Sequence, residues 1–300
     1  MSSSRRRVAF VLSGGASLGA IQVGMLRALV DHGVRPDVIV GTSVGAINGA
    51  FLACRDFTAR TVDDLGSVWL DVRRGDVFPI APITSLRGVL GARSNLVPVG
   101  GLRQLVRRHT DCENLEDLPT PLHVVACDVL TGREVRLSEG PLVEAVLASA
   151  AIPGVFPPIP WGGQVLIDGG VINNTPMKHA LELGADQIYV LSTGGPCTLT
   201  APPRGALGML VHATSLLVGQ RFAGEALAAG ARTDVTILPP PCPIDVHPMD
   251  FSRPEELMTR AEATARAFLA DRSARIVALE DRRRDRRARP APSVELPPAG

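Results

Sequence analysis

The amino-acid sequence predicts an α/β fold with three layers, in which helices cover both faces of a central, mostly parallel sheet. Short β-branched runs at 8–12 and 37–40 each end in small residues, and each precedes a segment whose apolar residues recur at helical spacing. Strands that alternate with helices pair in parallel, because the connecting helix returns the chain to the same end of the sheet. The chain has 300 residues, 45% of them hydrophobic, which is enough for the core of one large domain.

The N-terminal part is a strand, helix, strand, helix unit. Its elements are VAFVL at 8–12, a helix from Ala20 that Gly33 and Pro36 stop, DVIV at 37–40, and a helix from Val44 to about Cys54. We expect its two strands to be parallel neighbours.

The rest of the chain alternates less regularly. Residues 69–109 contain several Pro and Gly breaks, and we assign them to short helices and loops that cover one side of the sheet. Further strands are expected at 121–129, 133–138, 164–168, 187–192 and 234–239, the first two joined by the turn 130–132. Further helices are expected at 141–151, 205–230 and 254–280.

We expect one domain over residues 5–275, because no repeat or linker divides it. Residues 281–300 are charged and Pro-rich and cannot build a core, so we expect a disordered tail. Acids interrupt its arginine clusters, so we expect at most weak, salt-sensitive attraction to an anionic membrane.

Composition excludes several classes of function. A net charge of +1 and an aromatic content of 4% argue against nucleic acid as the partner. The five cysteines are an odd number without C-x-x-C spacing, so we expect them to be reduced and the protein to be cytoplasmic. The apolar run at 8–12 is too short for a signal peptide or a membrane span.

GTSVG at 41–45 matches the pattern G-x-S-x-G between a strand and a helix. The backbone must reverse sharply there, which explains the small residues Gly41 and Gly45. Ser43 stands at a helix N-terminus, where the dipole and free amides favour developing negative charge. The alternatives are a nucleophilic serine and a serine that only caps the helix.

SGGASLGA at 13–20 is a glycine-rich turn between the first strand and the first helix. Ala16 stands where a dinucleotide-binding loop has its second glycine, and the absence of a following Gly-Lys-Ser/Thr excludes a Walker loop. The remaining readings are a loop of backbone N–H groups that binds an oxyanion and a plain turn rich in small residues.

VLIDGGVINNTP at 165–176 places Asp168 at the end of a strand, before two glycines. Open α/β sheets build their sites at the carboxyl ends of strands, so we expect Asp168 to be exposed at the same edge as Ser43. A turn aspartate is the alternative. The preceding ASAAIPGVFPPI at 148–159 is either core or the wall of an apolar substrate pocket.

In this order, SGGASLGA, GTSVG, ASAAIPGVFPP and DGGVINNTP resemble the patatin-like phospholipase family over about residues 7–195. In that family a serine–aspartate dyad cleaves acyl esters without a histidine, and a glycine-rich loop forms the oxyanion hole. The resemblance implies the following roles: nucleophile Ser43, general base Asp168, oxyanion loop Gly14, Gly15 and Ala16, and supporting glycines Gly41, Gly45, Gly169 and Gly170. It implies a phospholipid or another acyl ester as substrate, with no cofactor and no metal.

Two residues depart from the family pattern. Leu18 replaces the usual Arg or Lys, and Ala16 replaces a third glycine. A non-catalytic lipid-binding or scaffold protein with the same fold is an alternative, which the altered Leu18 favours and the intact Ser43 and Asp168 argue against.

A Ser-His-Asp esterase is another alternative. Its histidine would be His179, His212 or His247, and His247 is the best candidate because it lies in a loop. The dyad instead predicts that Ser43 and Asp168 lie within hydrogen-bond reach, about 2.6–3.2 Å apart.

Overall fold

The structure is a computed structural model of the chain, and it describes residues 5–79, 94–194, 197, 202 and 205–288. Its strands are β1 (Val8–Leu12), β2 (Val38–Thr42), β3 (Leu122–Asp128), β4 (Glu134–Leu137), β5 (Ile159–Trp161), β6 (Gln164–Asp168), β7 (Gln187–Leu191) and β8 (Asp234–Leu238). Its helices are α1 (Ala20–Asp31), α2 (Val44–Ala53), α3 (Ala59–Asp71), α4 (Arg74–Val77), α6 (Gly100–His109), α7 (Leu142–Ser149), α8 (Met177–Glu182), α9 (Gly205–Gly230) and α10 (Pro254–Ala288). Short 3-10 helices lie at η1 (Ala16–Gly19), η2 (Leu115–Asp117) and η3 (Gly169–Val171).

Within the described residues the strands form one sheet of eight strands in the order β5-β6-β3-β2-β1-β7-β8, and β4 also pairs with β3. Strands β3, β2, β1, β7 and β8 are mutually parallel, whereas β4, β5 and β6 run antiparallel to their neighbours. The expected mostly parallel α/β sheet is confirmed. The expected parallel pairing of the first two strands and the 121–138 strand pair are also present.

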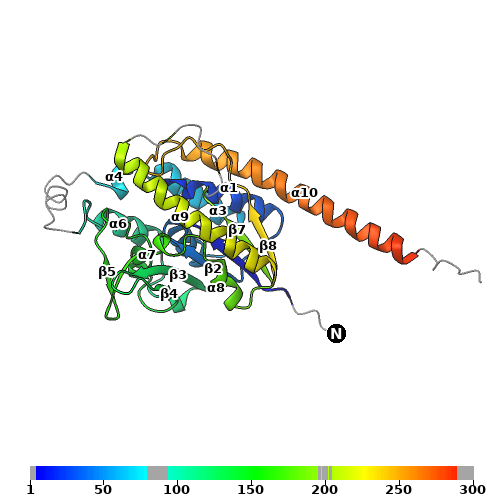
Figure 1. The fold of residues 1–300 in the computed structure, drawn as a ribbon, viewed down its shortest axis with the longest axis horizontal. Coiled ribbons are helices and arrows are strands. Elements are labelled where there is room, and N and C mark those ends of the chain that lie inside the picture. The colour runs from blue at the N-terminus through cyan, green and yellow to red at the C-terminus, as the bar shows by residue number, and fades with distance from the viewer. Residues whose placement is uncertain (1–4, 80–93, 195–196, 198–201, 203–204, 289–300) are drawn as a thin grey trace, which may run out of the picture.

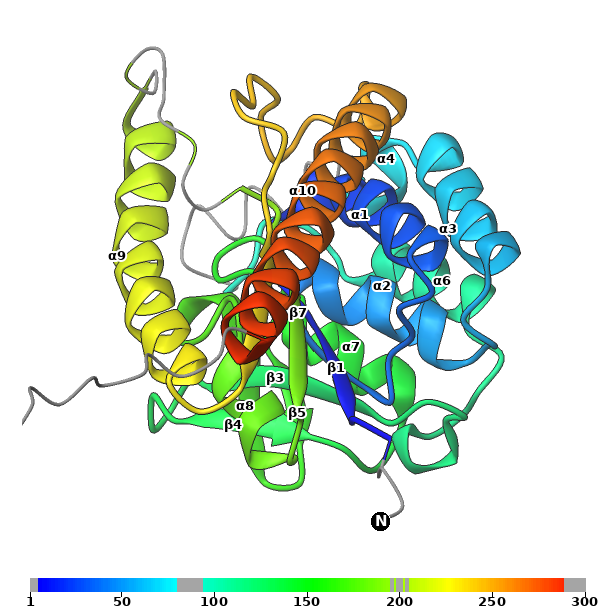
Figure 2. The same cartoon turned by 90° about the vertical axis from the view of Figure 1, so that its right-hand side faces the viewer.

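Two apolar clusters on opposite faces of the sheet make this a three-layer structure. Side chains of alternate residues in β1 pack on opposite faces of the sheet, because successive side chains in a strand point in opposite directions. Phe10 and Leu12 belong to the larger cluster, which contains residues of α1, α2, α3, α6, α7 and α10. Ala9 and Val11 belong to the smaller one, beneath α8 and α9. Figure 2 shows α8 and α9 on one side of the sheet, with α1, α2 and α3 on the other.

Helix α10 packs on α1 through its first turns and then extends beyond the rest of the molecule (Figure 1). Gly24 of α1 permits a close approach, because a Cβ there would overlap the backbone of Met258 and Glu262. The helix continues to Ala288, into the segment that we expected to be a disordered tail from residue 281. That expectation is therefore wrong for residues 281–288, and residues 289–300 lie outside the described residues.

Two further expectations need correction. Strand β5 was not predicted; it contains Pro160, which the strand tolerates because it lies at the edge of the sheet. The cysteines are not all reduced, because Cys197 and Cys242 form a disulfide. Disulfides are typical of oxidising compartments, so this bond removes the reason for expecting a cytoplasmic protein.

No helix in the described part of the chain combines the length and the apolar composition that crossing a membrane requires.

Candidate active site

Ser43 lies in a strained turn between β2 and α2. Its backbone adopts φ 53° and ψ −122°, and among the described non-glycine residues only Ala16 shares a positive φ. Such angles cost free energy and persist only where the surroundings hold them. Here the N–H group of Ser43 donates to Oγ of Ser149 at 2.8 Å, and its carbonyl accepts from the N–H of Ala46 at 2.9 Å.

The two glycines of GTSVG let this turn fit against β1. A Cβ on Gly45 would overlap the backbone of Leu12 and Ser13, and one on Gly41 would lie 2.6 Å from the carbonyl oxygen of Gly45. Both residues therefore support the turn by close backbone approach, which only glycine allows.

Asp168 meets Ser43 directly. Oγ of Ser43 donates to Oδ2 of Asp168 at 2.7 Å, so the hydrogen bond that the dyad hypothesis predicts is present. Both side chains are buried, with residue exposures of 7% and 5%. Our expectation that Asp168 would be exposed is therefore wrong.

The reason we gave for the meeting was also wrong, because β6 is not parallel to β2. Strand β6 runs antiparallel to β3 and pairs Asp168 with Ala126, while β3 pairs Val125 with Thr42 of β2. The register of three adjacent strands, rather than a shared carboxyl end, brings Asp168 beside Ser43.

Burial raises the pKa of Asp168 to about 6, although two hydrogen bonds to its carboxylate oppose the change. One comes from Ser43, and the other from the N–H of Gly170 to Oδ1 at 2.7 Å. Gly169 packs its Cα against the carbonyl of Val125, where a Cβ would overlap. The two glycines after Asp168 thus help to fix the position of its carboxylate. With a pKa of about 6, this carboxylate is ionised near neutral pH.

The loop after Asp168 is anchored by a polar cluster that the sequence did not reveal. Oγ1 of Thr42 donates to the carbonyl of Asn173 at 3.0 Å. The amide of Asn173 donates to Glu134 at 2.9 Å and to Glu225 of α9 at 3.0 Å. Arg221, also on α9, binds Glu134 at 2.9 Å. This ionic cluster lies on the face of the sheet that α8 and α9 cover, and it holds the loop that follows Asp168.

The glycine-rich loop approaches Ser43 from β1. The N–H of Gly14 donates to the carbonyl of Asn174 at 3.1 Å, so it is already occupied. The N–H groups of Gly15 and Ala16 have no hydrogen-bond partner within the described residues. Ala16 lines the same pocket as Ser43, whereas Leu18 packs partly buried against the apolar cluster of that face.

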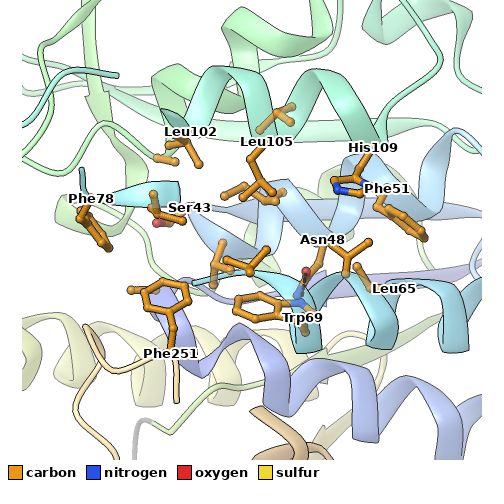
Figure 3. Close-up of a pocket in the computed structure, with 18 of the residues that line it drawn as sticks. Ser43, Asn48, Phe51, Leu65, Trp69, Phe78, Leu102, Leu105, His109 and Phe251 are labelled. Carbon is orange, nitrogen blue, oxygen red and sulfur yellow. Dashed lines mark hydrogen bonds between the residues drawn. The ribbon is translucent and has the colours of Figure 1, made fainter. Parts of the chain in front are cut away.

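An apolar pocket lies beside Ser43, and part of it is open to solvent. Helices α2, α3 and α6 form most of its wall, and Figure 3 shows their side chains converging on it. Ala150, Ile152 and Phe156 of the ASAAIPGVFPP stretch also line it. The stretch therefore contributes both to the wall of the pocket and to the buried core, since Ala150 and Phe156 belong to the larger apolar cluster as well.

The candidate histidines lie elsewhere. Nδ1 of His247 accepts from the N–H of Met249 at 3.1 Å, and the His247 carbonyl accepts from Oγ of Ser17 at 3.3 Å. His179 binds Glu134 and Glu182, and His212 lies in α9. Within the described interactions no imidazole contacts Ser43 or Asp168.

Ser149 is a site residue that sequence reasoning missed. Its hydroxyl is fully buried, accepts from the Ser43 N–H, and donates to the carbonyl of Val125 at 2.5 Å. No pattern in the sequence marks a serine of α7 as the partner of a turn 106 residues away. Among the described residues, no cluster of acidic, histidine and cysteine side chains could hold a metal ion.

Comparison with known proteins gives the family. The family model for Patatin-like phospholipase matches residues 10–181. The chain is 32% identical over 193 residues to Patatin-like phospholipase domain-containing protein 7 of Rattus norvegicus, covering 62% of this chain and 14% of that protein. It is 31% identical over 224 residues to an uncharacterized NTE family protein of Mycobacterium tuberculosis, covering 72% of this chain and 58% of that protein.

A further relative and a solved structure also match. Lysophospholipase nte1 of Aspergillus terreus is 31% identical over 203 residues, covering 63% of this chain and 12% of that protein. The crystal structure of VipD from Legionella pneumophila has a TM-score of 0.47 and 15% identity, covering 87% of this chain and 65% of that one. The chain spans less than two thirds of each of these proteins.

The match to the family model extends over more than half of the chain and includes both Ser43 and Asp168. The chain therefore belongs to the patatin-like phospholipase family.

Proposed function

We propose that this protein is a lipid acyl hydrolase in which Ser43 is the nucleophile and Asp168 is its general base. The observation that carries the proposal is the 2.7 Å hydrogen bond between them, buried beside an apolar pocket. A nucleophile within hydrogen-bond reach of a base, in a strained turn, is the arrangement that covalent ester cleavage needs.

In the first step Oγ of Ser43 attacks the ester carbonyl carbon while Asp168 takes the hydroxyl proton. With a pKa of about 6, Asp168 is ionised at neutral pH and is a better proton acceptor than an ordinary carboxylate. The tetrahedral intermediate then collapses and expels the alcohol, which receives the proton from Asp168. An acyl group remains on Ser43.

Backbone N–H groups stabilise the oxyanion of that intermediate. Gly15 and Ala16 have free N–H groups within the described residues, and Val44 begins α2, where an N–H has no intrahelical partner. The loss of one donor from such a hole typically costs about 10²–10³ in rate. We assign the donors to Gly15 and Ala16, with Val44 as a third.

In the second step water attacks the acyl carbonyl carbon while Asp168 accepts its proton, and Asp168 then returns this proton to Oγ of Ser43 as the fatty acid leaves. The apolar pocket suits the acyl part of a phospholipid, a lysophospholipid or another ester. A lysophospholipid is a reasonable first substrate because one relative carries the name lysophospholipase.

The test compares four proteins on a p-nitrophenyl ester and on a lysophospholipid: wild type, Ser43→Ala, Asp168→Asn and His247→Ala. We expect Ser43→Ala and Asp168→Asn to lose several orders of magnitude in rate, as the loss of a nucleophile or base usually does. His247→Ala should stay within a few-fold of wild type. Equal collapse of His247→Ala and Asp168→Asn would favour a triad, and no hydrolysis by wild type would favour a lipid-binding protein.

A further inference from the structure

Three helices line the pocket beside Ser43. The lining residues recur at helical spacing: Val44, Ile47 and Phe51 of α2, Leu65, Val68 and Trp69 of α3 with Val72 just after it, and Leu102, Leu105, Val106 and His109 of α6. Their apolar side chains belong to or pack against the larger apolar cluster, and we call the space that they leave beside Ser43 the channel.

The channel has a direction. In Figure 3, Ser43 lies at one end, near Phe78 and Phe251, whereas Phe51 and His109 lie together at the other. Because α2 runs from Ser43 to Phe51, its rise of about 1.5 Å per residue makes that distance roughly 12 Å along the helix. The reacting serine therefore stands at one end of a channel about 12 Å long.

The wall of the channel offers little to a polar ligand. The amide of Asn48 donates to Gln22 at 2.8 Å and to Gly19 at 3.1 Å, and its oxygen accepts from Nε1 of Trp69 at 3.0 Å. Every polar atom of Asn48 that faces the wall is thus already used. A hydrocarbon chain fits such a surface, at about a fourfold gain in affinity for each methylene buried.

The far end is held together by Arg55. Its guanidinium lies 4.2 Å from the centre of the Phe51 ring and donates to the carbonyls of Phe51 and His109, each at 3.0 Å. Burial lowers the pKa of His109 below its ordinary value, and the positive charges of Arg55 and Arg108 lower it further. The imidazole is therefore neutral at pH 7. An uncharged ring pair, fixed between α2 and α6, forms this end.

We propose that the channel binds the acyl chain of the substrate and limits it to about eight to ten carbons, since an extended chain advances roughly 1.25 Å per carbon along about 12 Å. Phe51 and His109 set the limit. The inference rests on the proposed function, because it places the ester carbonyl at Ser43.

The first measurement is kcat/KM for p-nitrophenyl esters with saturated chains of two to sixteen carbons. We expect kcat/KM to rise by up to about fourfold per methylene to an optimum at eight to ten carbons, and to fall beyond it. A profile that is flat, or that still rises at sixteen carbons, overturns the length limit.

Two matched variants locate the determinant. Leu105→Trp fills the middle of the channel, so the ratio of kcat/KM for the decanoate ester to kcat/KM for the acetate ester should fall at least tenfold. Leu70→Trp is the control, because Leu70 is on α3 but 42% exposed and outside the lining. An unchanged profile in Leu105→Trp contradicts the proposal. Phe51→Ala should shift the optimum to longer chains, and melting curves will show whether it folds.

A binding experiment tests the channel independently of ester hydrolysis. Decanoate is titrated calorimetrically into Ser43→Ala and into the double variants that add Leu105→Trp or Leu70→Trp. Binding that survives Leu70→Trp but not Leu105→Trp supports the channel even where no ester is hydrolysed. Equal binding by both double variants, or none by Ser43→Ala, overturns it.

Discussion

Burial raises the pKa of Asp168 by more than its two hydrogen bonds lower it, so the ionised carboxylate destabilises the folded protein. In the unfolded chain an aspartate ionises near pH 4, whereas the folded protein holds its proton until about pH 6. The folded state therefore loses stability as the pH rises between these values. Above pH 6 the full cost is present, about 3 kcal/mol for a pKa difference of this size.

Asp168→Asn should accordingly be more stable than wild type at pH 7, by up to about 3 kcal/mol, because a neutral side chain escapes the cost of burying a charge. The gain should shrink towards zero at pH 4, where the wild-type carboxyl is also protonated. Urea unfolding of both proteins at the two pH values measures it. A difference that does not depend on pH would show that Asp168 does not carry this cost.

The proposed mechanism makes the rate depend on the ionisation of Asp168. If Asp168 must be ionised to accept the Ser43 proton, kcat/KM should fall about tenfold per pH unit below about pH 6 and level off above it. A pH profile from 4.5 to 8 with a soluble ester measures this. An inflection near pH 7 that disappears in His247→Ala would instead indicate a histidine base.

At the scale of elements, α7 is joined to the nucleophile turn through Ser149. Removal of its hydroxyl leaves the buried N–H of Ser43 and a carbonyl of β3 unpaired, which costs about 1–3 kcal/mol. We expect Ser149→Ala to lose that much stability and to lower kcat, because the strained turn loses its tether. Ser67→Ala, on the exposed face of α3, is the control and should stay within about 0.5 kcal/mol of wild type. Equal behaviour of the two variants would contradict the tether.

The disulfide links the segment after β7 to the segment after β8. Cys197 and Cys242 are 45 residues apart, and a closed loop of that length is worth about 4 kcal/mol in the chain-entropy account. We expect a reductant to lower the urea midpoint of wild type but not of Cys242→Ser. Cys54→Ser, which changes a free cysteine, should keep the response to reductant. If reductant does not change the urea midpoint of wild type, the disulfide between Cys197 and Cys242 does not form.

The sequence predicted those elements whose cause is local. Strand β2, its turn and α2 follow from a β-branched run, two glycines and helical spacing, and all are present. The direction of β6 could not be predicted, because it depends on pairing with β3 across the chain. The Ser149 tether and the anchoring of Asn173 by α9 were missed for the same reason, since both join residues far apart in sequence. The roles of Ser43 and Asp168 came from the family resemblance, and their contact is what the structure adds.

For the whole molecule, the three layers place the apolar pocket on one face of the sheet and the ionic cluster around Glu134 on the other, with Ser43 and Asp168 between them. Helix α10 contributes to this body through Leu257, Met258, Ala261, Ala265 and Leu269, all of which are buried. The residues from 281 onward come after this packed part, and their sequence mixes arginines with Asp281 and Asp285.

Removal of residues 281–300 should therefore leave hydrolysis of a soluble ester and the melting temperature unchanged. Its basic residues should contribute at most about 1 kcal/mol each to binding an anionic membrane, weakened by the acids and by salt. Co-sedimentation of the full-length and truncated proteins with anionic liposomes, at low and high salt, measures this. Equal pelleting of both proteins at every salt concentration would exclude the tail as a membrane contact.

The central claim is that Ser43 is a nucleophile activated by Asp168. Labelling with a fluorophosphonate, followed by mass spectrometry of the peptides, tests it most directly, because the probe phosphonylates an activated serine whatever acyl chain the enzyme prefers. We predict one adduct, on Ser43, that forms quickly in wild type, at least a hundredfold more slowly in Asp168→Asn, and not at all in Ser43→Ala. An unlabelled wild-type protein, an adduct on another serine, or equally fast labelling of Asp168→Asn would contradict it.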